Sequence, residues 1–436
     1  MATAAGRAGL AVIRLSGPDA LCAVRQVAGS ITPRPRTLTR VRLIDPVDGS
    51  LIDHGMVAIF PAPASFTGED VVEFHVHGGR AVPSALIGVL TALPGVRPAE
   101  PGEFARRAFE NGKLDLTAAE GIADLIDAET AAQRRQALRQ MEGELGQLFE
   151  GWRRELLVAM ARFEATIDFS DEPMPEDLES QVHRNVAAIA GTMEAHLADG
   201  HRGERLRDGV MLTILGAPNV GKSSLLNWLA GREAAIVSET AGTTRDVIEV
   251  RLDLGSVLVI AADTAGMRDS EDAVEREGVR RARQRAASAD IRLVVLDATT
   301  WPKIPSEIGE MIDEGAVVIV NKIDLCRPQG ALTVAGHEVV AVSVHDGQGL
   351  NELMAAIQQR AAALCGSGGS PALTRARHRL ALEEAVAALR RLEVSRAPEL
   401  AAEELRLACR AIGRVTGRVN IEEMLDVIFR EFCIGK

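Results

Sequence analysis

Hydrophobic and polar residues alternate along the first part of the chain, up to about residue 112. Strict alternation predicts β-strands, because successive side chains on a strand point to opposite faces. Two stretches in the same part have helical spacing instead. The expected strands are 10–15, 55–60 and 71–76, and the expected helices are 81–93 and 103–111. The first 112 residues therefore predict an α+β domain.

The apolar period changes to three or four residues after Thr117. Thr117 and Glu120 have the spacing of a capping box, which marks the start of a helix. Further on, apolar residues recur at helical steps and predict one long amphipathic helix packed against other helices. These residues are Leu138, Met141, Leu145, Leu148, Trp152, Leu156, Met160 and Phe163.

From about residue 206 short apolar runs alternate with helical segments, as in a sheet of buried parallel strands. A Gly/Ser-rich segment at 366–371 ends this region, and helical patterning then continues to the C-terminus. The simplest arrangement is a helical domain that carries an inserted α/β domain. The expected strands are 210–215, 257–262, 293–296 and 317–320. The expected boundaries are 1–112, 113–205, 206–365 and 366–436.

Composition narrows the class of protein. A net charge of −12 argues against indiscriminate nucleic-acid binding, which requires neutralisation of phosphates. The five cysteines are widely spaced and form no C-x-x-C pair, which argues against disulfides or zinc and for a reducing, cytoplasmic location. No apolar run reaches the length of a membrane span, and the N-terminus does not have the pattern of a signal peptide.

Lysine is scarce in this chain, which has five lysines and 44 arginines. A lysine in such a sequence is a candidate for a role that arginine cannot fill, because the two cations differ in shape and hydration. Lys222 and Lys322 lie in the nucleotide-binding signatures described next. Lys113, Lys303 and Lys436 lie outside them.

Residues 216–223 read G-A-P-N-V-G-K-S, which fits the phosphate-loop pattern G-x-x-x-x-G-K-[ST] between a strand and a helix. Its glycines allow backbone N–H groups to turn toward phosphates, and the following helix N-terminus favours an anion. We expect Lys222 to hold the terminal phosphates and the Ser223 hydroxyl to bind Mg²⁺.

Two further signatures follow later strands. Asp263-Thr-Ala-Gly266 can reach the Mg²⁺ ion through water and contact a γ-phosphate. Asn321-Lys-Ile-Asp324 supplies a carboxylate that accepts two N–H groups of guanine, whereas adenine would leave it unpaired. The three signatures in this order indicate GTP as the ligand.

The segment between the first two signatures contains Gly242-Thr-Thr-Arg-Asp246, where a switch loop is expected. We assign a Mg²⁺-binding hydroxyl to Thr244. Met267 stands where many GTPases carry a glutamine that orients water. A methionine cannot do this, so the polar group that orients water must come from elsewhere.

Taken as a whole, the chain resembles the family of tRNA modification GTPases called MnmE or TrmE. The resemblance is carried by motifs in all three regions, which other GTPases do not share. They are IRLSG at 13–17, SFTGED at 65–70, HGG at 77–79, PGEF at 101–104, KLDL at 113–116, ADLI at 123–126, AGTTRD at 241–246 and FCIGK at 432–436.

This resemblance implies a multidomain fold: an α+β N-terminal folate-binding and dimerisation domain, an all-α helical domain, and an inserted α/β Ras-like P-loop GTPase domain. It also implies a homodimer that forms a heterotetramer with an FAD-dependent protein called MnmG or GidA. Together such proteins attach an aminomethyl or carboxymethylaminomethyl group to C5 of the wobble uridine of tRNA. They use a one-carbon unit of tetrahydrofolate, in its 5-formyl or methylene form.

Site residues are also implied by the resemblance. The folate-contacting positions are Arg14, Glu73, Lys113 and Lys436. Mg²⁺ corresponds to Ser223 and Thr244, and K⁺, which stimulates hydrolysis in the family, to Asn219, Ser238, Thr240 and Thr243. The residue that orients water corresponds to Glu275. The full set expected at GTP is Asn219, Val220, Gly221, Lys222, Ser223, Ser224, Ser238, Glu239, Thr240, Ala241, Gly242, Thr243, Thr244, Asp263, Thr264, Ala265, Gly266, Asn321, Lys322, Asp324 and Ser343.

Two alternatives stay open at this stage. The chain could be a regulatory GTPase switch, for example in ribosome assembly, without any modification chemistry. The second alternative concerns arginines spaced four residues apart from Arg406 to Arg418: they could contact tRNA phosphates or pair with acids such as Glu403 and Glu404.

Overall fold

The computed structural model describes residues 1–4, 6–29, 33–168, 178–232, 234–236, 249–263, 289–328, 332–366, 371–394 and 398–419, with residues 425, 428, 429 and 432 near the C-terminus. The chain divides into two compact units. The first contains Met1–Ala123, Gln140–Arg154 and Cys409–Lys436, and the second contains Asp124–Arg139 and Glu155–Ala408. No helix in the described ranges is long and apolar enough to cross a membrane.

A four-stranded antiparallel sheet forms the first part of the first unit, in the order β1-β4-β3-β2. Alternation in β4 buries Val72, Phe74 and Val76 against helices α1 and α2, and leaves Glu73 and His75 on the opposite face. The strands are β1 (Ala11–Ser16), β2 (Thr39–Ile44), β3 (Leu51–Phe60) and β4 (Val71–Val76), and the helices are α1 (Ala20–Ala28) and α2 (Ala81–Ala92). The three strands expected from alternation are confirmed.

The helices that follow correct two sequence predictions. The helix α4 begins at Leu116, and its cap is Asp115, whose Oδ1 accepts hydrogen bonds from the Ala118 N–H (2.8 Å) and the Thr117 hydroxyl (2.6 Å). The capping box assigned to Thr117 is therefore wrong. The expected long helix is interrupted at Gly143, whose φ of 89° no helix contains. The elements are α3 (Glu103–Glu110), α4 (Leu116–Asp127), α5 (Ala131–Met141), α6 (Glu144–Asp168) and α7 (Leu178–Leu197).

An eight-stranded sheet organises the second unit, in the order β11-β12-β10-β9-β5-β8-β7-β6. Its central strands are parallel and buried on both faces, as their continuous apolar runs predict. The strands are β5 (Val210–Leu215), β6 (Ala235–Ile236), β7 (Glu249–Leu254), β8 (Val257–Asp263), β9 (Ile291–Asp297), β10 (Ala316–Asn321), β11 (Thr333–Val334) and β12 (His337–Ala341).

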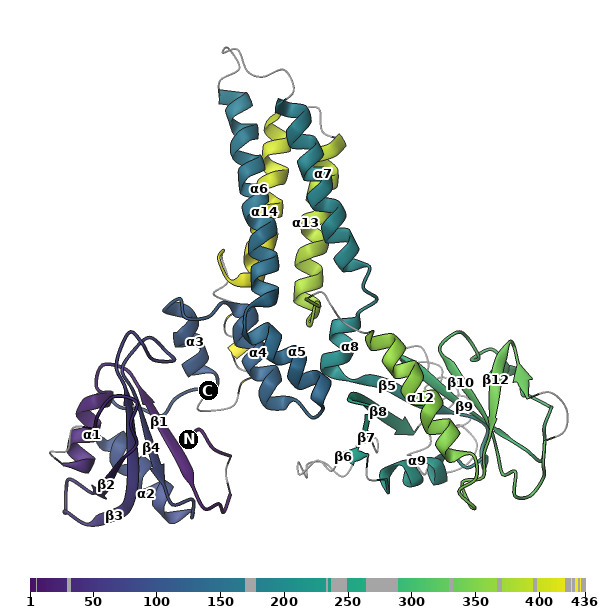
Figure 1. The fold of residues 1–436 in the computed structure, drawn as a ribbon, viewed down its shortest axis with the longest axis horizontal. Coiled ribbons are helices and arrows are strands. Elements are labelled where there is room, and N and C mark those ends of the chain that lie inside the picture. The colour runs from purple at the N-terminus through teal and green to yellow at the C-terminus, as the bar shows by residue number, and fades with distance from the viewer. Residues whose placement is uncertain are drawn as a thin grey trace, which may run out of the picture. The chain divides into compact units, whose positions relative to one another are not determined.

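The remaining helices are α8 (Arg202–Asp208), α9 (Lys222–Ala230), α11 (Ser306–Gly309), α12 (Leu350–Cys365), α13 (Ala376–Val394) and α14 (Pro398–Thr416). In the second unit α7 and α13 run side by side (Figure 1). Arg406 on α14 pairs with Glu164 (2.6 Å) and Glu403 (3.3 Å), and Arg391 pairs with Glu404 (2.8 Å). At Arg406, ion pairing is therefore the alternative that the structure supports.

Candidate functional site

The predicted phosphate loop leaves β5 at the edge of the sheet where the parallel strands end. Gly216 and Gly221 have φ of 153° and 101°, and Asn219 has φ of 64°. A Cβ on Gly216 would collide with the Val295 carbonyl, and one on Gly221 with the Asn321 amide. Both positions therefore need glycine for space as well as for backbone conformation.

Lys222 is the first residue of α9, and its ammonium group folds back over the loop. Its Nζ donates to the carbonyl oxygens of Gly216 (3.0 Å) and Ala217 (2.8 Å). Ser223 and Ser224 are exposed in the first turn of the helix. The arrangement places a cation, hydroxyl groups and a helix N-terminus around one small volume, which is suited to phosphate.

Asn321 connects this loop to the segment that follows β12. Its Nδ2 donates to the Val220 carbonyl (2.8 Å), and its Oδ1 accepts from the Val344 N–H (3.2 Å). The side chain is almost completely buried. The sequence placed Asn321 in the GTP-contacting set; the structure shows that it braces two loops against each other.

Replacing Asn321 with alanine is expected to lower the free energy of unfolding of this unit by about 1–3 kcal/mol, because the buried Val220 carbonyl and the partly buried Val344 N–H would lose their hydrogen-bond partner. Urea unfolding of the full chain measures this. Asn351→Ala, on the surface of α12, serves as the matched control. An unchanged unfolding midpoint would contradict the bracing role.

Lys322 and Asp324 belong to the same motif but have different interaction partners. Lys322 Nζ lies 2.7 Å from Asp297 Oδ2, at the end of β9. Burial alone would raise the pKa of Asp297, but hydrogen bonds from Lys322 and Thr299 outweigh it and lower that pKa. Asp324 is exposed, and its Oδ1 accepts from the Ser343 hydroxyl (2.6 Å). Asp297 was missed in the sequence, although its place after a buried strand is the same signal that singled out Asp263.

The segment after β12 is shaped by hydrogen bonds around Ser343. The Ser343 hydroxyl accepts from the Asp346 N–H (3.1 Å), and the Ser343 N–H donates to the Gln348 carbonyl (3.0 Å). The hydrogen bond to Asp346, with the charges of Asp346 and Asp324, raises the pKa of His345. The structure thus brings Ser343 and Asp324 together, as a guanine-side loop requires.

Several predicted residues lie outside the described part of the chain. They are Ser238, Glu239, Thr240, Ala241, Gly242, Thr243, Thr244, Thr264, Ala265, Gly266, Glu275 and Lys436. Asp263 is the last residue of β8, and its side chain is likewise outside the description. The geometry above therefore concerns the phosphate loop and the two loops on the base side.

A second constellation lies in the first unit, on the face of the sheet that α1 and α2 do not cover. Arg14 on β1 stands opposite Glu73 on β4, with Arg14 Nε 3.4 Å from Glu73 Oε1. The Arg14 guanidinium lies over the rings of Phe66 (5.3 Å) and Phe104 (4.9 Å). Burial lowers the pKa of Arg14, and the charge of Glu73 opposes this effect.

Lys113 lies against the loop that carries Phe66. A Cβ placed on Gly68 would be 3.2 Å from Lys113 Cε, and the neighbouring Asn111 donates to the Thr67 carbonyl (2.7 Å). Lys113 is exposed, so its ammonium group can reach a ligand. Of the four predicted folate residues, Arg14 thus lies on β1, Glu73 lies on β4, and Lys113 lies against the loop between β3 and β4. The fourth, Lys436, is outside the described residues.

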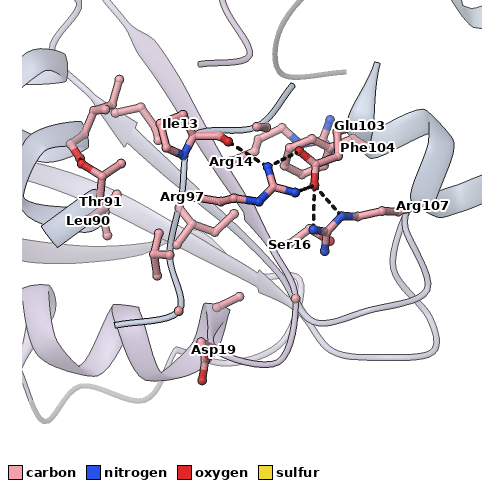
Figure 2. A pocket seen from close by; sticks show the side chains of 18 of the residues that line it. Ile13, Arg14, Ser16, Asp19, Leu90, Thr91, Arg97, Glu103, Phe104 and Arg107 are labelled. Carbon is pink, nitrogen blue, oxygen red and sulfur yellow. Dashed lines mark hydrogen bonds and ion pairs between the residues drawn. The ribbon is translucent and has the colours of Figure 1, made fainter. Parts of the chain in front are cut away.

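A cavity of about 360 Å³ adjoins Arg14 (Figure 2). Its polar wall is an ion-pair network in which Glu103 binds Arg97 (2.6 Å) and Arg107 (2.7 Å), and Arg107 also binds Glu69 (2.9 Å). Burial alone would raise the pKa of Glu103, but hydrogen bonds from Arg97, the Glu100 N–H and Arg107 lower it to about 2. The cations of this wall are therefore already neutralised by acids of the same unit.

Comparisons with known proteins cover nearly the whole chain. The family described as the GTP-binding protein TrmE N-terminus matches residues 1–113, and the MnmE helical domain matches residues 116–433. The tRNA modification GTPase MnmE of Paramagnetospirillum magneticum is 57% identical over 436 residues, which covers 100% of this chain and 98% of that protein. The protein of the same name from Rhodospirillum rubrum is 53% identical over 447 residues, covering 100% and 98%.

A eukaryotic relative is also similar. The mitochondrial 5-taurinomethyluridine-[tRNA] synthase subunit GTPB3 of Danio rerio is 48% identical over 457 residues, covering 99% of this chain and 91% of that protein. Among solved structures, Aquifex aeolicus Era bound to GDP and aluminium fluoride has 27% identity and a TM-score of 0.28, over 43% of this chain and 69% of that one.

Proposed function

The chain belongs to the MnmE family of tRNA modification GTPases, and from this premise we propose that it hydrolyses GTP while modifying C5 of the wobble uridine in tRNA. The group added is aminomethyl or carboxymethylaminomethyl. The proposal includes an FAD-dependent partner of the MnmG or GidA type, a homodimer that joins it in a heterotetramer, and a cytoplasmic location. Its one-carbon donor is a tetrahydrofolate derivative.

The nucleotide site is proposed at the phosphate loop and the two loops next to it. Lys222 and the N–H groups of residues 219–224 would hold the phosphates, and Asp324, oriented by Ser343, would accept the N1–H and N2–H groups of guanine. Asn321 keeps the phosphate and base sides at a fixed separation because it is hydrogen bonded to both. Bound Mg²⁺ neutralises charge that develops on the phosphates. Ser223 and Thr244 would hold it.

A K⁺ ion is the proposed stimulator of hydrolysis. Within the described part of the chain the exposed Asn219 side chain makes no hydrogen bond, which leaves its amide oxygen available to a cation at the phosphate loop. Ser238, Thr240 and Thr243 would complete the set, and Glu275 would orient the attacking water. A cation at this point could take the place of an arginine finger.

GTP turnover is expected to rise when Na⁺ is replaced by K⁺ at constant ionic strength. Asn219→Ala should remove the difference between the two salts, and Glu275→Ala should remove most of the K⁺-stimulated rate. Steady-state phosphate release measures both. Equal rates of the unaltered protein in the two salts would contradict the K⁺ assignment.

The folate site is proposed around Arg14 and Glu73, with Lys113 and Lys436 on the charged tail of the ligand. Arg14 Nε is buried and makes no hydrogen bond among the described residues, although it lies 3.4 Å from Glu73 Oε1, so the pair can reorient toward a ligand. Phe66 and Phe104 provide aromatic surface next to it. The pair of Arg14 and Glu73 carries the proposal, because a GTPase that acted only as a switch in ribosome assembly would have no use for it.

Glu73→Gln is expected to weaken 5-formyltetrahydrofolate binding by about 10- to 100-fold, because its amide group would face the N–H groups of the pterin with a donor. Equilibrium dialysis of the full chain measures this. Glu110→Gln, an exposed change on α3 in the same unit, is the matched control, and an unchanged urea unfolding profile shows that the variant is folded. Absence of folate binding by the unaltered chain at millimolar ligand would favour the ribosome-assembly alternative.

A further inference from the structure

A second cavity, of about 530 Å³, lies in the second unit and has no part in the proposed GTP or folate sites. Its walls come from α5, α8, the turn between β7 and β8, and the last residues of α12. Val257, at the start of β8, lines it, whereas the phosphate loop follows the other end of the parallel strands. The cavity is therefore at the opposite edge of the sheet from the nucleotide.

The charged side chains that line this cavity are all arginines: Arg135, Arg139 and Arg202. Arg135 and Arg139 are one helical turn apart on α5 and so share a face, and Arg202 begins α8. Among the described residues that line the cavity there is no carboxylate. This is unusual in a chain with 61 acidic and 49 basic residues.

The arginines here also differ from others on the helices. Arg390, Arg391 and Arg406 are all paired with glutamates. Within the described ranges, by contrast, neither Arg135 nor Arg202 has an ion-pair partner. Burial raises the pKa of the Cys365 thiol, which also lines the cavity, to about 11, so this thiol is neutral and does not act as their counter-ion. Two unneutralised guanidinium groups thus face one concave surface.

We propose that this cavity binds phosphate groups of the RNA backbone, and that it is a contact surface for the tRNA substrate. Guanidinium groups bind phosphate through two parallel N–H donors, and such contacts position a nucleic acid without reading its sequence. The volume is that of a site for a small ligand, so a sugar–phosphate unit fits within it. The inference rests on the proposed function, because it takes tRNA as the macromolecule that supplies the phosphates.

The test is tRNA binding by the full chain as a function of salt. The double variant Arg135→Gln/Arg202→Gln is expected to bind tRNA about tenfold or more weakly near 0.1 M KCl, and to reduce the slope of log K against log salt by about 1.5 to 2. Arg135→Lys/Arg202→Lys should restore most of the slope, since it restores the charge. GTP turnover should stay unchanged in both.

The matched control removes the same charge elsewhere: Arg40→Gln/Arg42→Gln, on exposed positions of β2, should leave affinity and slope unchanged. If the unaltered chain binds tRNA and the cavity variant keeps its affinity and slope, the inference is wrong while the proposed function stands. If the unaltered chain and its complex with the FAD-dependent partner both fail to bind tRNA, the proposed function fails and the inference fails with it.

A competition experiment with inorganic phosphate distinguishes the RNA backbone from free phosphate as the anion that the cavity binds. Binding of the RNA backbone predicts that inorganic phosphate displaces tRNA no better than chloride at equal ionic strength. Displacement by phosphate at low millimolar concentration, lost in the Arg135→Gln/Arg202→Gln variant, would assign the cavity to a free anion and overturn the RNA proposal.

Discussion

Lys222→Ala is expected to lower GTP turnover by about 100-fold or more. Lys222 Nζ is held 2.8–3.0 Å from two carbonyl oxygens of the phosphate loop, so the ammonium is fixed at the place proposed for the phosphates. Alanine removes the charge that would stabilise the terminal phosphates. Steady-state phosphate release and binding of a fluorescent GTP analogue separate turnover from affinity.

Two further lysine variants make the experiment specific. Lys222→Arg should not restore turnover, because a planar guanidinium cannot occupy the space enclosed by the Gly216 and Ala217 carbonyls. Lys303→Ala, an exposed position in a turn, is the matched control and should behave like the unaltered protein. Retention of more than about half of the turnover by Lys222→Ala would refute the assignment.

Asp324→Asn is expected to weaken GTP binding by about 100-fold or more and to make xanthosine triphosphate the preferred nucleotide. The asparagine keeps an oxygen that accepts from the Ser343 hydroxyl, so the side chain stays oriented. The NH₂ group of the asparagine then faces the exocyclic NH₂ group of guanine, so that two hydrogen-bond donors meet. Xanthine has a carbonyl oxygen at that position, and the amide can donate to it.

Competition between GTP and xanthosine triphosphate, measured by turnover, tests this prediction. Asp313→Asn is a suitable control because Asp313 is a half-exposed acid in the same unit that pairs with Arg292. Loss of binding to both nucleotides would indicate structural damage rather than a role in base recognition. A GTP preference that survives the substitution would place guanine recognition at another residue.

The sequence predicts the strands of the sheets better than it predicts where the helices begin and end. The runs at 71–76 and 210–215 coincide with β4 and β5 because side-chain period and burial leave few other arrangements. The break at Gly143 was missed, since the apolar seam continues across it into α6. The sequence assigned the cap of α4 to Thr117, whereas the structure shows Asp115 in that role. Both are good capping residues, and only the backbone conformation decides between them.

At the candidate site, sequence signatures single out side chains suited to bind a ligand more readily than side chains that hold other groups in place. Lys222 and Asp324 were singled out from motifs, and Ser343 from the resemblance. The bracing role of Asn321 was not, because its partners Val220 and Val344 lie more than twenty residues away on either side and contribute only backbone atoms. Neither the motifs nor the resemblance pointed to the Arg135 and Arg202 cavity, because its walls come from α5, α8, the turn between β7 and β8 and the end of α12, which are far apart in the sequence.

The central claim is that GTP hydrolysis and the Arg14–Glu73 site of one chain serve tRNA modification together. The most direct measurement is nucleoside analysis of wobble uridine in tRNA from cells that lack this gene and carry either the unaltered gene, Lys222→Ala or Glu73→Gln. The account predicts that only the unaltered gene restores the C5-modified uridine. Full restoration by either variant, or normal modification in cells without the gene, would contradict it.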